Sequence, residues 1–287
     1  MGGRRAPRRL PAPEQLAARA RAAAAAGSDA PDVPVRDAAT VVLVRDGAGG
    51  PELYLLRRHA RMTFAPGQAV FPGGGVDPRD RDVEVSWAGP PPSEWAARLR
   101  CDARTARGLV CAAVRETFEE SGVLLAGDDA DTVVGDTTGT AWEADRLALE
   151  SRERSLADLL RRRRLVLRSD LLGAWAHWVT PRLEPRRYDT RFFVAVLPAG
   201  QRTRDVSSES DAVAWMRPAD VLDAVRDGRL AMMPPTVQTC VEIAELGHAA
   251  DALPAAAARS LVTVEPRLVV EGDDVWLEIA GPEEEPS

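Results

Sequence analysis

Residues 115–122 read Arg115-Glu116-Thr117-Phe118-Glu119-Glu120-Ser121-Gly122, and this stretch decides how the rest of the chain is interpreted. On a helix the three glutamates project from one face, because they are spaced i, i+3 and i+4. Carboxylates this close repel each other, whereas divalent cations between them would be favourable, and Mg²⁺ prefers oxygen ligands. We therefore interpret Glu116, Glu119 and Glu120 as a metal site. The alternative is a solvated acidic face.

The segment around these glutamates is predicted to be a helix from about residue 103 to residue 121. Val110, Val114 and Phe118 form one apolar stripe, and Gly122 is typical of the residue that follows a helix. The glutamates would thus project from a helix whose other side packs into the core.

Upstream of this helix the pattern predicts three strands. Residues 38–44 are a β-branched apolar run, residues 52–57 follow a turn, and residues 68–71 lead into Pro72-Gly73-Gly74-Gly75. The first two strands are expected to form a hairpin. Residues 78–102 combine charges with a run of prolines and a short helix predicted from Ser93, a composition more typical of an excursion from the main fold than of a core element.

Downstream of the helix, strands and helices alternate. A helical region is predicted at roughly 144–165, ending in four arginines that we expect to be a solvated helix end, with phosphate binding as the alternative. Further strands are predicted at 174–180, 191–197, 213–216, 261–264 and 268–279, helices from 218 and 235, and an Ala/Pro linker at 249–258. The order predicts an α/β (α+β) fold in which helices cover a mixed sheet.

Length and composition indicate one large domain in a chain of 287 residues. We place this domain at 35–280, after a flexible Arg/Ala/Pro-rich segment at 1–34 and before an acidic tail at 281–287. The net charge of −7 and the pI near 5.2 argue against a general nucleic-acid binder. Three cysteines without metal-ligand spacing favour reduced thiols in the cytoplasm, and no apolar run is long enough for a membrane span.

The two halves of the central region together resemble a known signature. Phe71-Pro72-Gly73-Gly74-Gly75, followed by the stretch from Arg115 to Val123, is similar to the Nudix hydrolase box G-x5-E-x7-R-E-U-x-E-E-x-G-U, where U is a bulky aliphatic residue. Asp80 stands at the position of the first glutamate, and Thr117 replaces the usual aliphatic. Between Asp80 and Arg115 lie 34 residues in place of 7. The chain thus carries an insertion within its box.

The interruption of the box resembles that found in one branch of this superfamily, the coenzyme A and acyl-coenzyme A diphosphatases. Residues 178–193 and 233–236 are also similar to that branch. A second pattern linked to coenzyme A agrees at Arg58, Gly67 and 71–74 but departs at Leu56, His59 and Thr63. The resemblance implies a Nudix-like α/β/α sandwich and Mg²⁺-dependent (or Mn²⁺-dependent) hydrolysis of the diphosphate to adenosine 3′,5′-bisphosphate and a 4′-phosphopantetheine product.

The resemblance also assigns roles within the box. Glu116, Glu119 and Glu120 would be the metal ligands, and Arg115 would pair with a glutamate and hold its side chain in place. Gly73, Gly74 and Gly75 would allow close approach of the backbone to metal and substrate.

Other roles are open at this stage. The general base is a helix glutamate, Glu209 or Asp211, although the last two can also be solvated loop acids. The arginines that could bind substrate phosphates, with surface charge as the alternative, are Arg58, Arg61, Arg187 and Arg191. We expect a structural role for His177, and for Trp175 and Trp178 core packing is the commoner alternative to stacking on an adenine.

These residues are compatible with three functions. The first is a coenzyme A diphosphatase, the second a diphosphatase for another nucleoside diphosphate-linked compound such as ADP-ribose or NADH, and the third a non-catalytic ligand sensor. All three imply a small-molecule ligand and neither nucleic acid nor membrane. The oligomeric state is open, with a homodimer as one option.

Overall fold

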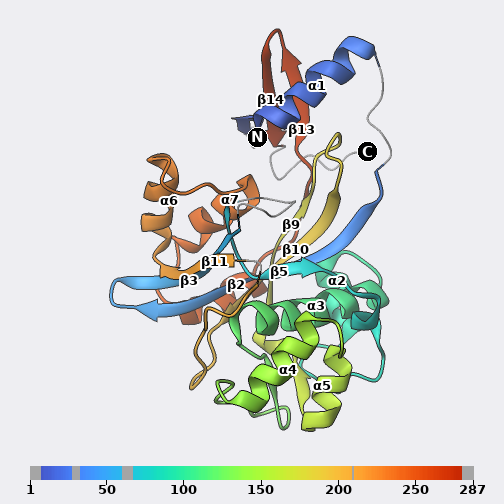
Figure 1. The fold of residues 1–287 in the computed structure, drawn as a ribbon, viewed down its shortest axis with the longest axis vertical. Helices are drawn as coiled ribbons and strands as arrows, with labels where there is room; N and C mark the ends of the chain where they lie inside the picture. The colour runs from blue at the N-terminus through green and yellow to red at the C-terminus, as the bar shows by residue number, and fades with distance from the viewer. Residues whose placement is uncertain (1–7, 28–32, 60–66, 209, 280–287) are drawn as a thin grey trace. The chain divides into compact units, whose positions relative to one another are not determined.

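The computed structural model describes residues 8–27, 33–59, 67–208 and 210–279, which fall into two compact units (Figure 1). The first unit comprises the described parts of residues 1–37, 177–190 and 262–287. The second comprises the described parts of residues 38–176 and 191–261. The second unit therefore contains both halves of the interrupted box.

The first unit is built on a small antiparallel sheet. Its strands β1 (Arg8–Pro11), β13 (Arg267–Glu271) and β14 (Asp274–Ile279) lie in the order β1-β14-β13. Helix α1 (Glu14–Ala26) buries Ala17 and Ala20 with Val275 of β14. Residues 8–26 therefore differ from the flexible segment predicted for 1–34, because their alanines have a sheet to pack against. The single domain predicted at 35–280 stays a prediction.

A mixed sheet forms the centre of the second unit. Its main strands lie in the order β11-β3-β2-β10-β9, and β12 pairs in parallel with the part of β9 that belongs to the first unit. The bounds of these strands are β2 (Val35–Gly47), β3 (Gly50–Arg58), β9 (Gly173–Val179), β10 (Arg187–Val196), β11 (Ser210–Met216) and β12 (Thr263–Val264). The predicted hairpin of β2 and β3 is confirmed.

Short strands complete this unit. β4 (Ala69–Val70) pairs with β3, and β5 (Gly73–Gly75) pairs with β2. A second, small sheet consists of β6 (Trp87–Ala88), β8 (Val166–Arg168) and β7 (Ala126–Gly127). The glycine-rich run is thus held in the central sheet by β2.

Helices cover both sides of the central strands. In Figure 1, α3 lies on one side of β2, β3 and β11, with α4 and α5 beyond it, and α6 and α7 lie on the other side. The bounds are α2 (Pro92–Leu99), α3 (Ala103–Ser121), α4 (Thr140–Glu150), α5 (Leu156–Arg163), α6 (Pro218–Arg226), α7 (Pro234–Ile243) and α8 (Ala252–Ala257), with 3-10 turns η1 (Pro78–Arg81), η2 (Ser169–Leu171) and η3 (Ala249–Asp251). The predicted α/β fold is confirmed.

The insertion at 78–102 is part of the core, which corrects the prediction of an excursion. Trp95 and Leu99 of α2 have no exposed surface, and the Trp95 ring meets Phe193 of β10 edge-on at 5.8 Å between centroids. The short helix predicted from Ser93 is present as α2, and the proline run leads into it, because proline is well tolerated in the first turn of a helix.

Two elements downstream differ in detail from the sequence-based prediction. The helical region predicted at 144–165 consists of two helices, because Arg152 has a positive φ and Ser155 caps α5 with Asp158 in a reciprocal capping box. The expected linker at 249–258 forms η3 and α8, in which Ala252 and Ala256 are buried.

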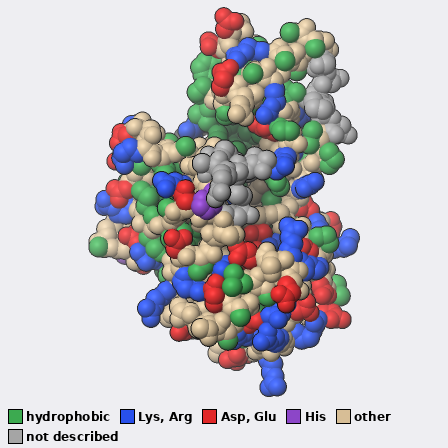
Figure 2. Space-filling view, in the orientation of Figure 1, with side chains coloured by type: hydrophobic (Ala, Val, Ile, Leu, Met, Phe, Trp, Pro, Cys, Tyr) green, Lys and Arg blue, Asp and Glu red, His purple; other side chains and the backbone are tan. Residues whose placement is uncertain are grey.

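The arginine run at the end of α5 is only partly solvated. Arg162 and Arg163 both form ion pairs with Asp145 of α4, whose side chain is 1% exposed. In Figure 2, basic and acidic side chains lie interspersed over the region of α4 and α5. These ion pairs join α5 to α4, and the arginines do not form a continuous basic surface. None of the helices within the described ranges is both long and apolar enough to cross a bilayer.

Candidate active site

Helix α3 has the ends and the buried stripe that the sequence predicts. Asp102 caps the start by accepting a hydrogen bond from Thr105 N at 2.9 Å, and Gly122 follows the end with φ of 75°. Val110, Val114 and Phe118 are completely buried. This stripe fixes the rotation of the helix, and with it the direction in which the glutamates project.

The glutamates do not form a solvated face. Glu119 is 8% exposed and Glu120 7% exposed, and the Glu116 side chain is 12% exposed. Thr117, which replaces the usual aliphatic residue, is also buried, and its hydroxyl donates to the Ala113 carbonyl one turn earlier. Burial of several carboxylates requires compensating partners.

One set of partners is the glycine-rich strand β5. The Gly73 N–H donates to Glu120 Oε2 at 2.8 Å, and the Glu116 carboxylate lies in the space that a Cβ on Gly74 would occupy. A side chain at position 74 would therefore displace Glu116. The two halves of the interrupted box are thus in direct contact.

Arg115 joins the remaining carboxylates. Its guanidinium donates to Asp80 through Nε and Nη2 at 3.0 Å each, to Glu116 Oε1 at 2.8 Å and to both oxygens of Glu119 at 3.2 Å. Nη2 also donates to the Gly75 carbonyl at 2.9 Å. The expected pairing of Arg115 with a glutamate is present. The contact with Asp80 brings the residue at the first glutamate position of the box to the acidic helix.

The electrostatics of this cluster fit a cation. Three carboxylates, those of Asp80, Glu116 and Glu119, surround one guanidinium. Burial and the negative charge of Glu116 raise the pKa of Glu119 from 4.5 to about 7. A divalent ion would offset this surplus of negative charge, and the donors are the hard oxygens that Mg²⁺ and Mn²⁺ take.

The side chains are arranged around Arg115 and not around a metal position. Within residues 8–27, 33–59, 67–208 and 210–279, no three His, Cys, Asp or Glu side chains stand in a metal-binding arrangement. Arg115 Nη1 donates to both Glu116 and Glu119, and so it takes up oxygens that a metal would use. Each carboxylate has about four lone-pair sites, so Glu116 and Glu119 could also hold a metal while Arg115 orients them.

The other predicted site residues are less closely connected to the cluster. Glu209 and Arg61 lie outside the described residues. Arg58 ends β3, opposite Ser210 of β11. Arg191 is 3% exposed and donates to the Leu99 carbonyl, which is a structural contact. Substrate roles for Arg58 and Arg191 stay predictions.

The remaining acid, histidine and tryptophan candidates have protein partners. Asp211 forms an ion pair with Arg57 at 2.6 Å. His177 contacts Asp189 through Nε2 and Thr263 through Nδ1, which agrees with the predicted structural role. Trp175 is buried under Arg259 and fits core packing better than an adenine platform.

Sequence reasoning missed the loop at 201–208 beside the cluster. Its Arg204 carbonyl accepts a hydrogen bond from the Tyr54 hydroxyl at 2.9 Å. Burial raises the pKa of Tyr54, and the charges of Asp205 and Glu120 add to this effect, so both carboxylates act on the same phenol. No local motif marks these residues, and only the fold brings them to the end of α3.

Comparison with known proteins points to one family. The family model described as the NUDT19 Nudix domain matches residues 104–243. The chain is 26% identical over 211 residues to "Putative nudix hydrolase 7" of Caenorhabditis elegans, covering 74% of this chain and 61% of that protein. It is 29% identical over 250 residues to "Acyl-coenzyme A diphosphatase NUDT19" of Gallus gallus, covering 70% of this chain and 65% of that protein. The match therefore spans less than two thirds of either relative.

A solved structure agrees with both the fold and the family. The crystal structure of a NUDIX hydrolase from Alicyclobacillus acidocaldarius superposes with a TM-score of 0.65 at 29% identity, covering 78% of this chain and 97% of that one. These comparisons together support a Nudix hydrolase. Within that superfamily it resembles the acyl-coenzyme A diphosphatase branch, as its interrupted box predicted.

Proposed function

We propose that this chain is a divalent-metal-dependent diphosphatase that hydrolyses coenzyme A or an acyl-coenzyme A. The products would be adenosine 3′,5′-bisphosphate and (acyl-)4′-phosphopantetheine, and the metal Mg²⁺ or Mn²⁺. The observation that carries the proposal is the contact of Glu120 with the Gly73 N–H, which joins the acidic helix to the glycine-rich strand. The substrate class is supported by relatives named acyl-coenzyme A diphosphatase.

Each group of residues in the cluster has a separate role in this proposal. Glu116, Glu119 and Glu120 would hold the metal, and a bound metal would neutralise charge on the diphosphate and acidify an attacking water. Arg115, held on its other edge by Asp80, would orient Glu116 and Glu119. Gly73, Gly74 and Gly75 keep the backbone close to these carboxylates.

The proposal also covers the remaining roles. A helix glutamate or Glu209 would act as the general base, and Arg58 and Arg191 would contact the substrate. We further propose a cytoplasmic location, a small-molecule substrate and no nucleic-acid partner, with a homodimer as one option for the assembly.

A substrate panel tests this function. Purified protein would be incubated with coenzyme A, an acyl-coenzyme A, ADP-ribose, NADH and a dinucleotide polyphosphate, each with Mg²⁺, Mn²⁺ or EDTA, and the products separated by chromatography. We expect metal-dependent release of adenosine 3′,5′-bisphosphate from the coenzyme A compounds. Turnover of ADP-ribose or NADH without turnover of coenzyme A would overturn the assignment of coenzyme A as the substrate. Binding without turnover of any compound would favour a sensor.

A further inference from the structure

The C-terminal turn of α3 is completed by residues from outside the helix. The last four carbonyls of a helix lack partners within it, so other groups must satisfy them. The Phe118 carbonyl accepts from the Gly122 N–H at 2.9 Å, which is local. The Glu119 carbonyl instead accepts from Arg146 Nη1 of α4 at 2.8 Å, and the Ser121 carbonyl accepts from the Arg204 N–H at 2.9 Å. Two distant segments therefore meet at the turn that carries Glu119 and Glu120.

Arg146 is the centre of this connection. Its side chain is 2% exposed and donates to two carboxylates of its own helix in addition to the Glu119 carbonyl. Nη2 and Nε contact Glu143 at 2.7 and 3.1 Å, and Nη1 contacts Glu150 Oε2 at 3.0 Å. A guanidinium held on every edge has one orientation, because its donors form a rigid fork.

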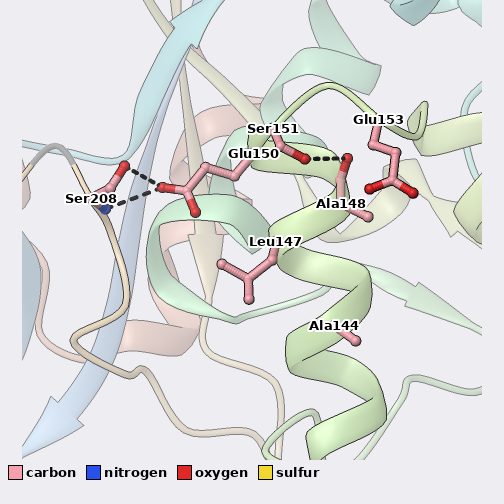
Figure 3. A pocket seen from close by; sticks show the side chains of 7 residues that line it. All are labelled: Ala144, Leu147, Ala148, Glu150, Ser151, Glu153 and Ser208. Carbon is pink, nitrogen blue, oxygen red and sulfur yellow. Dashed lines mark hydrogen bonds between the residues drawn. The ribbon is translucent and has the colours of Figure 1, made fainter.

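The two carboxylates extend the network to the loop at 201–208. Glu143 Oε2 accepts from Arg204 Nη1 at 2.7 Å. Glu150 Oε1 accepts from both the N–H and the hydroxyl of Ser208, at 3.1 and 2.5 Å, as Figure 3 shows. The loop is thus tied to α4 at two points four residues apart.

We propose that Arg146 is a positioning residue for the reaction: it fixes the last turn of α3, and with it Glu119, and holds the loop at 201–208 against the end of that helix. Arg146 acts through the Glu119 backbone and through Glu143 and Glu150. Its role in the reaction rests on the proposed function, whereas the coupling of loop and helix is independent of it.

The importance of such a residue follows from how the metal ligands act. A misplacement of about 1 Å at a reacting group can lower the rate by roughly 100-fold. Glu119 lies next to the end of its helix, where helices fray unless their carbonyls are satisfied. Loss of the hydrogen bond from Arg146 would therefore displace Glu119 first.

The test compares Arg146→Met with Arg146→Lys and with a matched control, Arg168→Met. Arg168 is also a buried arginine that donates to a backbone carbonyl (Thr132) and a carboxylate (Asp170), but these contacts involve neither α3 nor the loop at 201–208. For each variant that folds by circular dichroism, one measures kcat and KM for coenzyme A, the Mg²⁺ concentration for half-maximal rate, and amide hydrogen exchange of residues 201–208.

For Arg146→Met we expect kcat to fall about tenfold or more, with little change in KM, a higher Mg²⁺ requirement and faster exchange in the loop. Arg146→Lys should recover part of kcat, and Arg168→Met should leave kcat and the Mg²⁺ requirement near wild type. Equal effects of the Arg146 and Arg168 substitutions on kcat and Mg²⁺ would overturn the reaction role, and unchanged loop exchange in Arg146→Met would overturn the coupling.

A second pair of variants decides the matter if Arg146→Met does not fold. Glu150, Glu153 and Ser208 line one pocket beside α4 (Figure 3). Glu150→Ala removes the tie to Ser208, while Glu153→Ala alters an exposed acid for which Figure 3 draws no hydrogen bond to Ser208. Faster loop exchange and lower kcat in Glu150→Ala alone support the proposal, and identical behaviour of the pair contradicts it. If the wild-type protein hydrolyses no diphosphate, the proposed function fails, whereas the exchange data still test the coupling.

Discussion

Asp80 and Arg115 are 35 positions apart, and yet they form a two-pronged ion pair in which Nε and Nη2 each lie 3.0 Å from a carboxylate oxygen. Asp80 is held at this place by η1, where its carboxylate accepts from the Asp77 N–H at 2.8 Å. The inserted residues therefore lie between Asp80 and α3 in the sequence, and the two halves of the box remain in contact in the fold.

Asp80→Asn should destabilise the protein by about 1–3 kcal/mol, because an amide has one acceptor oxygen and cannot keep the two-pronged contact with Nε and Nη2 of buried Arg115. Asp80→Glu keeps the charge and should retain most of the stability. Urea unfolding measures both. Asp220→Asn, which removes a surface partner of Arg217, is the control and should cost less than about 1 kcal/mol. Asp80→Asn with wild-type stability would mean that this ion pair is dispensable.

Gly74→Ala should lower activity more than stability, because the new methyl group would occupy the space of the Glu116 carboxylate. Gly135→Ala is the matched control, since no neighbouring atom lies within 4 Å of a Cβ built there. Steady-state kinetics and thermal melts of the two variants provide the comparison. If Gly74→Ala turned over coenzyme A at the wild-type rate, close packing of Gly74 on Glu116 would have no catalytic importance.

The raised pKa of Glu119 gives the metal-free protein a particular dependence on pH. A carboxyl whose pKa rises from 4.5 to about 7 on folding binds protons more tightly when folded. Stability from this group is therefore complete below pH 4.5 and is lost as the pH rises through 7. In EDTA we expect the urea concentration at the unfolding midpoint to decrease as the pH is raised from 5 to 8, and to decrease less in Glu119→Gln. At pH 8, added Mg²⁺ should raise the urea midpoint of the wild type. Equal slopes in both proteins would contradict this assignment.

Trp95 provides a test of the insertion as a core element. Trp95→Ala removes a completely buried indole that packs on Phe193, and should cost about 3–5 kcal/mol. Val83→Ala alters a residue of the same insertion that is 77% exposed and should change stability by no more than about 0.5 kcal/mol. Similar melting temperatures for the two variants would show that the insertion is peripheral after all.

Local patterns predicted α3 well because its signals are all local. The stripe at Val110, Val114 and Phe118, with Gly122 after it, predicted a helix from about 103 to 121, and α3 spans Ala103–Ser121. The break between α4 and α5 was also visible in principle, since Ser155 and Asp158 form a capping-box pattern.

Other features depend on contacts between distant residues and could not be predicted in this way. Trp95 is buried only because Phe193, 98 positions later, meets it in the fold. Arg146 resembles any surface arginine of a helix until the Glu119 carbonyl and the loop at 201–208 are placed beside it. The acidic cluster was predictable as a motif, whereas its supporting residues were not.

The most direct test of the central claim is release of adenosine 3′,5′-bisphosphate from coenzyme A by the wild-type protein and by Glu120→Gln, measured side by side with Mg²⁺. Glu94→Gln, a surface change on α2, serves as the control. We predict Mg²⁺-dependent turnover by the wild type and the control. In Glu120→Gln the rate should fall by more than about 100-fold while the fold is retained, a larger loss than substitution of an outer-shell partner causes. Full Mg²⁺-dependent turnover by Glu120→Gln, or none by the wild type, would contradict the account.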